Sequence, residues 1–217
     1  MSELAVIVPV LGRPHRVEPL LASIRGATPE CTILFIADPD DDAEIAALEA
    51  AGAEFICEPG SYAHKINFGI AQTTEPLIFS GADDLDFKAG WYEAAKAKLT
   101  NRVAVVGTQD CGHRWVKAGK HATHVLTTRE YVERYGTIDE PGKLFHEGYY
   151  HVCCDIELVE TAKARGAWAF AHEAVVEHLH PFWGKGEMDA TYERAYESSR
   201  RAHDRALLKR RRPLWSK

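Results

Sequence analysis

The sequence predicts a single α/β domain in which helices cover a mostly parallel sheet. Leu4–Val10 is a continuous apolar run rich in β-branched residues, which is typical of a strand buried on both faces. Segments of strand and helix character then alternate as far as residue 80, the pattern of parallel strands joined by crossover helices. With 217 residues, 46% of them hydrophobic and 27% charged, the chain has the composition of one globular domain. Wholesale disorder, collagen and a coiled-coil rod are excluded.

Each predicted element has a local signal, such as an apolar period, a cap or a stop residue. In the first half, strands and helices alternate over Leu4–Val10, Pro14–Arg25, Thr32–Ala37, Asp41–Ala51, Glu54–Cys57, Tyr62–Gln72 and Pro76–Ser80. In the second half we predict helices at Ala89–Leu99, Thr128–Tyr135, Cys154–Arg165 and Met188–Leu208, and strands at Val103–Gly107, Trp168–Phe170 and Ala174–Glu177. Asp110–His121 and Asp139–Tyr150 are predicted loops, and Pro181–Gly186 is a predicted turn. No repeat or linker divides the chain, so we expect one domain over 1–185, followed by a charged helix and basic tail over 186–217.

Charge is distributed unevenly along the chain. The net charge is −6, yet residues 200–217 hold eight Lys or Arg and one acid, which makes that stretch +7 and leaves −13 on the rest. This asymmetry indicates either a solvated helix end or contact with a polyanion, of which DNA carrying hydroxylated bases is one example. The apolar side of this segment is thin, so we expect no stable membrane insertion.

The N-terminus and the cysteines favour a cytoplasmic protein. Met1-Ser2-Glu3 is acidic and leads straight into a strand, unlike the basic start of a secretory signal. The apolar runs are far shorter than the roughly 20 residues of a membrane-spanning helix. The five cysteines include the adjacent pair Cys153 and Cys154 and form no CxxC motif, so we expect reduced structural thiols.

Acidic residues follow the second and fourth predicted strands. Asp38 comes after the second strand, and Asp83, Asp84 and Asp86 come after the fourth. In an open parallel sheet, ligands bind outside the carboxyl ends of the strands. Carboxylates that crowd one edge repel one another unless a cation lies among them, so this edge predicts a Mg²⁺ or Mn²⁺ site. For Asp40–Asp42 we favour a different role, the capping of the helix that follows.

Five short motifs together resemble the family-two glycosyltransferases with the GT-A fold. The motifs occur in the family's order over about residues 4–185, and they are Val6-Ile7-Val8-Pro9-Val10 with Gly12-Arg13-Pro14, Lys65-Ile66-Asn67-Phe68-Gly69, Leu77-Ile78-Phe79-Ser80-Gly81-Ala82-Asp83-Asp84, Cys154-Asp155-Ile156-Glu157-Leu158, and His178-Leu179-His180. In the family these correspond to the first strand and loop, the helix before the metal strand, the aspartate metal motif, the helix start that carries the catalytic base, and the late histidine of the metal shell. One departure is Gly81, which stands where the family's first motif aspartate often lies.

The resemblance implies a role for each candidate residue. The metal would be held by Asp84 and Asp86 jointly, or by a site centred on Asp83, together with His180, which is preferred to His178 because it precedes a loop. The donor would contact Pro9, Arg13, Asp38, Lys65, Asn67, Asp83 and Trp183. Asp155 would be the catalytic base, with Glu157 in reserve. An acid at a helix start also complements the helix dipole, so a structural role for Asp155 stays open.

These observations predict a metal-dependent, inverting glycosyltransferase that uses a nucleotide sugar, most simply a UDP-sugar. The departing diphosphate gains negative charge, which Mg²⁺ or Mn²⁺ and the cations of Arg13 and Lys65 could stabilise. The attacking hydroxyl must lose a proton, which requires a positioned carboxylate. The alternatives are a nucleotidyltransferase on a related fold and a non-catalytic nucleic-acid-binding module.

Overall fold

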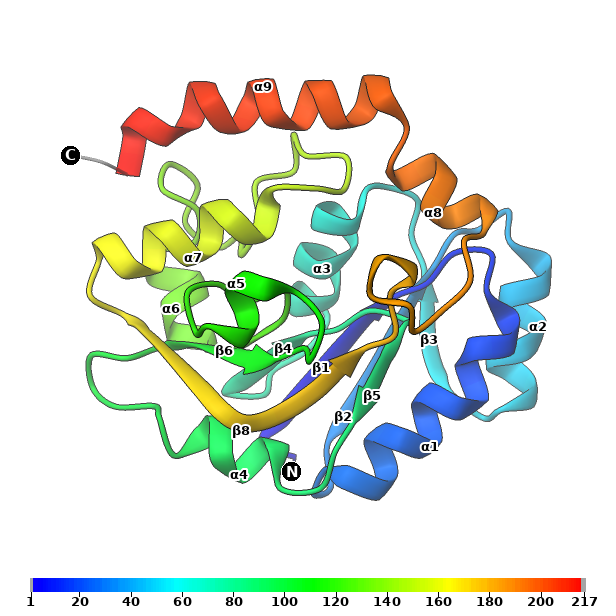
Figure 1. The fold of residues 1–217 in the computed structure, drawn as a ribbon. Helices are drawn as coiled ribbons and strands as arrows, with labels where there is room; N and C mark the ends of the chain where they lie inside the picture. Colours follow the sequence, from blue (N-terminus) through cyan, green and yellow to red (C-terminus); the bar gives the residue numbers. More distant parts are fainter. Residues whose placement is uncertain (1, 216–217) are drawn as a thin grey trace.

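The computed structural model describes residues 2–215 as three layers, with a curled sheet between two sets of helices (Figure 1). The strands are β1 (Leu4–Pro9), β2 (Thr32–Ala37), β3 (Glu54–Cys57), β4 (Leu77–Ser80), β5 (Leu85–Phe87), β6 (Val105–Gln109), β7 (Val125–Thr128) and β8 (Trp168–His178). The helices are α1 (Val17–Ala27), α2 (Asp42–Ala50), α3 (Tyr62–Ala71), α4 (Trp91–Lys96), α5 (Arg114–Lys117), α6 (Arg129–Arg134), α7 (Cys154–Ala164), α8 (Ala190–Ala195) and α9 (Ser198–Trp215), with short 3-10 helices η1 (Pro14–Arg16) and η2 (Pro181–Trp183).

The sheet has the strand order β3-β2-β1-β4-β7-β6-β8-β5. Strands β1 to β4 pair in parallel, as do β6 and β8, whereas β7 runs antiparallel to both of its neighbours and β5 runs antiparallel to β8. The expected mostly parallel α/β architecture is therefore confirmed. Its parallel half places the ends of β1, β2 and β4 at one edge, where the acidic residues were expected to meet.

Two apolar clusters hold the layers together, one on each face of the sheet. The side chains of β1 alternate, so that Leu4, Val6 and Val8 join the cluster under α1, α2 and α4. Ala5 and Ile7 face the opposite cluster, which contains residues of α3, α6 and α7. A strand buried in this way on both faces explains why its sequence is continuously apolar.

Polar side chains define where several helices begin. Asp41, Ser61, Thr128 and Asp189 each accept a hydrogen bond from the backbone N–H three residues ahead, at the starts of α2, α3, α6 and α8. Each bond satisfies a donor that the first turn of a helix leaves unpaired. The expectation that the Asp40–Asp42 stretch caps a helix is confirmed through Asp41.

Several expected elements differ from those in the structure. The two short strands expected around residues 168–177 are one strand, β8, because an irregularity in its pairing with β6 accommodates the exposed His172 and Glu173. The single helix expected over Met188–Leu208 is broken into α8 and α9 after Tyr196. The loop expected over Asp110–His121 contains α5. Strands β5 and β7 carried too short an apolar pattern to be recognised.

The C-terminal segment packs against the domain rather than projecting from it. Helix α9 crosses the top of the molecule in Figure 1, above α7. Asp204 is fully buried and accepts hydrogen bonds at 2.9–3.0 Å from the backbone N–H groups of Tyr150, His151 and Val152. Leu207 packs into the cluster beneath. Within residues 2–215, no helix is both long and apolar enough to span a bilayer.

The three hydrogen bonds to Asp204 predict a large effect of its removal on stability. Asp204→Ala should lower the free energy of unfolding by about 2–3 kcal/mol, because it leaves buried N–H groups without an acceptor. Urea unfolding followed by circular dichroism measures this, with Glu193→Ala on the exposed side of α8 as the control. Equal stability of both variants would mean that Asp204 does not hold the 150–152 loop.

Candidate functional site

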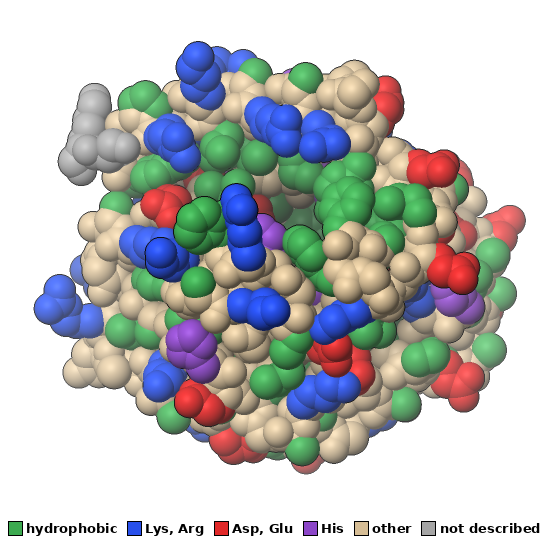
Figure 2. All heavy atoms as spheres, viewed as in Figure 1, with side chains coloured by type: hydrophobic (Ala, Val, Ile, Leu, Met, Phe, Trp, Pro, Cys, Tyr) green, Lys and Arg blue, Asp and Glu red, His purple; other side chains and the backbone are tan. Residues whose placement is uncertain are grey.

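A cavity of about 990 Å³ lies at the edge where β1, β2 and β4 end, and α8 and α9 form one of its walls. In Figure 2 it is visible as a central hollow below α9, with hydrophobic and His side chains in its depth. Its size suits a ligand larger than a typical metabolite, since ligand pockets span roughly 300–1,000 Å³. Residues from the first strand to the last helix line it.

Arg13, from the loop after β1, organises the floor of the cavity. Its guanidinium donates to Asp83 at 2.7 Å and to both carboxylate oxygens of Asp189, at 2.8 and 3.0 Å. It also lies 3.8 Å from the centre of the Tyr192 ring. Burial, followed by the neighbouring charge of Asp84, raises the pKa of Asp83, which the Arg13 cation only partly offsets. Arg13 is therefore committed to the protein's own acids.

Asp84 and His178 meet at the same point of the cavity. The Nε2 of His178 lies 2.9 Å from Oδ2 of Asp84, and the Tyr192 hydroxyl donates to that oxygen at 2.5 Å. Burial favours the neutral form of Asp84, but the His178 charge and these hydrogen bonds outweigh it and hold the pKa of Asp84 well below its usual range. Burial likewise opposes the charge on His178, and Asp84 reverses that effect, so the pKa of His178 is raised.

The fit of a divalent cation can be judged from this donor set. In nucleotide-binding sites Mg²⁺ is held by one or two carboxylates, and substrate phosphates and water supply the other ligands. Asp84 offers a carboxylate, which suits Mn²⁺ or Mg²⁺, and His178 adds an imidazole, a softer ligand. Among residues 2–215, no group of three or more His, Cys, Asp or Glu side chains is arranged to hold a metal ion. A cation here would depend on a bound diphosphate for the rest of its ligands.

Unpaired polar atoms gather around this point. Buried nitrogens of His113, His124, His178 and Trp183 lack a hydrogen-bond partner within the described residues, and all four side chains line the cavity. The Nδ1–H of His124 donates a hydrogen bond to the Ser80 carbonyl oxygen at 2.8 Å. Burial lowers the pKa of His124 to about 4. Its Nε2 is therefore left as an unused acceptor. Buried polar atoms are rarely left unsatisfied, so the cluster indicates a site that a polar ligand completes.

Asp155 lines the cavity from the start of α7. Its Oδ2 lies 3.0 Å from Nε2 of His121, and its Oδ1 accepts the N–H of Ile156. Burial would raise the pKa of Asp155, but the charge and hydrogen bond of His121 outweigh it, so the pKa stays below its usual value and the carboxylate is ionised. Cys153, just before α7, has a φ of 75°, a left-handed conformation that costs a non-glycine residue energy.

Nine of the twelve candidate residues line this one cavity. They are Pro9, Arg13, Asp38, Lys65, Asp83, Asp84, Asp155, His180 and Trp183. Lys65 is ion-paired with Asp38 at 2.9 Å, so, like Arg13, it is already neutralised. His180 accepts the N–H of Phe182 at Nδ1 and meets the Tyr196 hydroxyl at Nε2. Both nitrogens are thus engaged, and it is His178 rather than the expected His180 that contacts Asp84.

Asp86 and Asn67 lie outside the cavity, contrary to the sequence-based assignment. Asp86 is on the edge strand β5, where its partly exposed side chain pairs with Lys88. The expected joint site of Asp84 and Asp86 is therefore not formed. Asn67 exchanges hydrogen bonds with the backbone of Phe145 and so fixes the 139–150 loop to α3.

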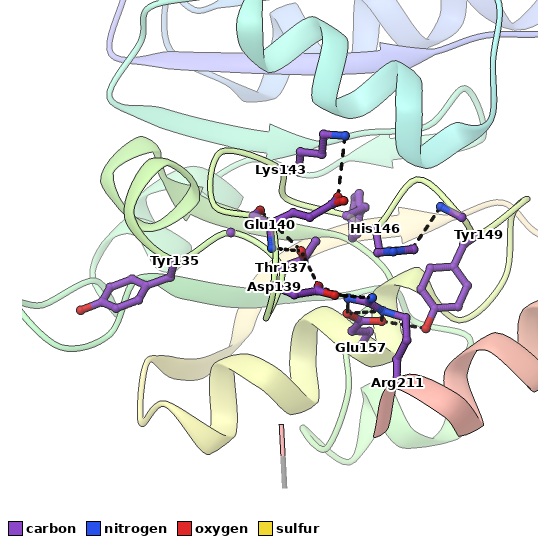
Figure 3. Close-up of polar contacts among 12 residues, drawn as sticks. Tyr135, Thr137, Asp139, Glu140, Lys143, His146, Tyr149, Glu157 and Arg211 are labelled. Atoms are coloured by element: carbon purple, nitrogen blue, oxygen red, sulfur yellow. Dashed lines mark hydrogen bonds and ion pairs between the residues drawn. The ribbon is translucent and has the colours of Figure 1, made fainter. Parts of the chain in front are cut away.

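Glu157 is also away from the cavity, in a polar cluster where α7, α9 and the segment 137–149 meet (Figure 3). Arg211 donates to both carboxylate oxygens of Glu157 at 2.7–3.0 Å and to Asp139, and the Tyr149 hydroxyl donates to Glu157 at 2.8 Å. We therefore expect Glu157 to act as a structural ion-pair partner rather than as a base. Arg211, expected to belong to a basic run, points inward.

This arrangement predicts that Glu157 acts on stability alone. Glu157→Gln should lower the free energy of unfolding by about 3 kcal/mol, because removal of one charge leaves Arg211 poorly compensated in a buried setting. Chemical denaturation measures the loss, and Glu160→Gln on the exposed part of the same helix is the control. A variant of full stability but lost nucleotide binding would contradict the structural role.

Some residues of the site carried no clear signal in the sequence. His121 and His124 lie in and beside a segment expected to be a loop, and Tyr192 lies in a helix expected to be charged and solvated. Their partners are 34 to 108 residues away. A local pattern cannot reveal such pairs, although the unusual number of histidines, 11 in 217 residues, was a signal that could have been used.

The close packing around Gly81 explains why this position departs from the family pattern. A Cβ at this position would lie 2.9 Å from the carbonyl oxygen of Ile7, and the N–H of Gly81 donates to that same oxygen. The end of β4 therefore packs too closely on β1 to accept an aspartate here. The acids that reach the cavity are the later Asp83 and Asp84.

The fold matches solved glycosyltransferase structures over nearly the whole chain. A mannosyltransferase from Pyrobaculum calidifontis, in complex with GDP-mannose and Mn²⁺, has a TM-score of 0.63 at 14% identity, with 97% of this chain and 75% of that chain covered. Glucosyl-3-phosphoglycerate synthase from Mycobacterium tuberculosis, with Mn²⁺, UDP-glucose and phosphoglyceric acid, has a TM-score of 0.64 at 13% identity, covering 94% and 79%. The same enzyme with Mg²⁺ and UDP gives 0.63 at 15% identity, covering 96% and 79%. The expected GT-A-type fold is therefore confirmed.

No protein-family model and no curated protein matches the sequence.

Proposed function

We propose that this protein is a metal-dependent glycosyltransferase that moves a sugar from a nucleotide diphosphate sugar to a hydroxyl acceptor with inversion. The observation that carries the proposal is the joint presence, in one cavity at the strand ends, of the Asp84–His178 pair and the ionised Asp155. The matched enzymes of this fold were solved with Mn²⁺ or Mg²⁺ and with UDP- or GDP-linked ligands. These ligands support the same chemistry here.

Each group of the cavity has a distinct task in this reaction. Asp84 and His178 would hold Mn²⁺ or Mg²⁺, which when bound stabilises the negative charge of the departing diphosphate. Asp155 accepts the proton of the attacking hydroxyl, and His121 orients its carboxylate. Direct attack by the acceptor, assisted by one base, inverts the configuration of the sugar carbon.

The donor end of the cavity is best suited to the nucleoside. Asp38 and Lys65 form an ion pair at the end of β2, beside Pro9 and Val10. Asp38 can accept a hydrogen bond from a ring N–H of the base, as the family resemblance implies. A UDP-sugar is the simplest donor on this basis. GDP-sugars are the alternative donors to be tested beside it.

The loop after β1 counts against a nucleotidyltransferase. Such an enzyme needs the backbone N–H groups of this loop to bind phosphate. Here the N–H of Gly12 donates to Asp41 and the N–H of Arg13 donates to Glu44, both at 2.6 Å. The loop is therefore closed by the acids of α2 and its neighbourhood, and it does not offer an anion site.

The metal assignment predicts a difference between two neighbouring aspartates. Asp84→Asn should abolish the Mn²⁺-dependent rise in melting temperature that UDP produces, whereas Asp86→Asn should keep it, because only Asp84 meets His178 in the cavity. Ligand at 100 times its Kd should stabilise the wild type by about 2.7 kcal/mol. Thermal-shift assays with UDP and GDP, with and without excess chelator, make the measurement. UDP stabilisation that survives in chelator would refute a metal-supported site.

The base assignment predicts a rate effect without a binding effect. Asp155→Asn should slow the release of UDP from a UDP-sugar, with water as acceptor, by roughly 10²–10⁴-fold, the usual range for a general base. UDP affinity, measured by calorimetry, should change little. Glu160→Gln is the matched control, since Glu160 also lines the cavity from α7 but pairs with Lys163. Near-normal turnover in Asp155→Asn would move the base elsewhere and leave Asp155 as a helix-start acid.

A further inference from the structure

The cavity has an excess of positive charge on one wall. Its lining acids already have cationic partners within 3.0 Å, in the pairs Asp38–Lys65, Asp83–Arg13, Asp84–His178, Asp155–His121 and Glu160–Lys163. Further arginines from α8 and α9 line the same cavity, among them Arg194, Arg200, Arg201 and Arg205. The floor is therefore electrically compensated, whereas the helical wall carries a surplus of cations.

Several of these arginines have no anion to neutralise them. Within residues 2–215, no carboxylate forms an ion pair with Arg194, Arg201 or Arg205, and Arg200 only approaches Glu197, at 3.9 Å on the surface. Figure 2 shows Lys and Arg side chains along α9, above the hollow, and others over α5 on its opposite side. An unneutralised group of arginines beside a cavity attracts a phosphate or carboxylate, and the planar guanidinium binds phosphate in a bidentate manner.

We infer that this wall is the acceptor subsite and that the acceptor bears phosphate, with Arg200, Arg201 and Arg205 as its recognition residues. The inference rests on the proposed glycosyl transfer, because it assigns the second substrate of the same cavity. The donor's own diphosphate belongs beside Asp84, where the proposed metal would be held, so the arginines of α9 are left for the acceptor. A cavity of about 990 Å³ has room for both molecules.

The spacing of the arginines along α9 bears on which kind of phosphorylated acceptor they could bind. Arg201 and Arg205 are four residues apart, which places them on one face of α9. At 1.5 Å per residue this pair spans about 6 Å of the helix, which is enough to contact one phosphate or two neighbouring ones. Successive phosphates of a nucleic-acid strand rise by about 3.4 Å. The exposed aromatic rings of Trp115 and Tyr150 also line the cavity, where a base could stack.

The test compares two sources of phosphate with two matched variants. Fluorescence anisotropy measures binding of a labelled DNA duplex with hydroxymethylated pyrimidines and of its unmodified counterpart, and calorimetry measures binding of glycerol 3-phosphate. The triple variant R200A/R201A/R205A should bind the recognised probe roughly tenfold or more weakly. For DNA it should also flatten the salt dependence by about one unit for each phosphate that it no longer neutralises. The control R25A/K98A/R102A removes the same charge from exposed positions away from the cavity and should bind like the wild type.

The outcomes separate the acceptor from the donor. Binding of DNA that the triple variant weakens identifies a nucleic-acid acceptor, and binding of glycerol 3-phosphate alone identifies a small phosphorylated one; both support the inference. No binding of either probe at low salt, or equal binding by the triple variant and its control, overturns it. UDP binding by the wild type is measured separately, so a chain that binds phosphate probes but no nucleotide would refute the proposed function and not the arginine subsite.

Discussion

The cavity depends on one buried guanidinium. Arg13 bridges the loop after β1, the acid that follows β4 and the cap of α8, and it stacks on Tyr192. Tyr192 in turn donates to Asp84. Replacement of this cation by a neutral group would leave Asp83 and Asp189 without compensation, and the helix that closes the cavity would lose its attachment. The acids at the end of β4 and the helix α8 that covers them are thus held by the same set of ionic and hydrogen-bonding contacts.

The acids that line the cavity are each paired with a cation, and this changes the expected role of a metal ion. Acids crowded at a sheet edge suggested strong mutual repulsion relieved by a metal. In the structure Asp38, Asp83, Asp84 and Asp155 each already have a cationic neighbour. A divalent cation held by both residues would therefore have to separate the Asp84–His178 pair rather than occupy a group of uncompensated carboxylates.

The sequence was sufficient for the parallel strands β1 to β4 and for most of the cavity because their signals are local. The apolar run of β1 and the acids directly after β4 reveal themselves within about ten residues. Local sequence patterns could not decide which residue of each pair, Asp84 or Asp86 and His178 or His180, belongs to the site. It depends on the pairing of Leu85 with His178 across β5 and β8, which sets Asp84 beside His178. Such a contact between residues 94 apart leaves no trace in local periodicity.

The same limitation applied to the C-terminal helix. A run of arginines was interpreted as one feature, yet adjacent members point to different sides of the helix. Arg211 is buried against Glu157, whereas Arg210 is exposed and Arg212 lines the cavity. On a helix neighbouring residues lie about 100° apart, so a basic run divides its charge among several faces. Composition alone could not assign these faces, because the position of α7 decides them.

The attachment of Arg13 to Asp189 also has a consequence for folding kinetics. The two residues are 176 positions apart, so the contact closes almost the entire chain into a loop. The entropy cost of that closure must be met before the ion pair can form, whereas β1, β2 and β4 pair over much shorter separations. We therefore expect the parallel core to assemble ahead of the cavity. Interactions that form this late act mainly on the unfolding rate, so the charge arrangement around Arg13 sets how long a folded molecule keeps its site intact.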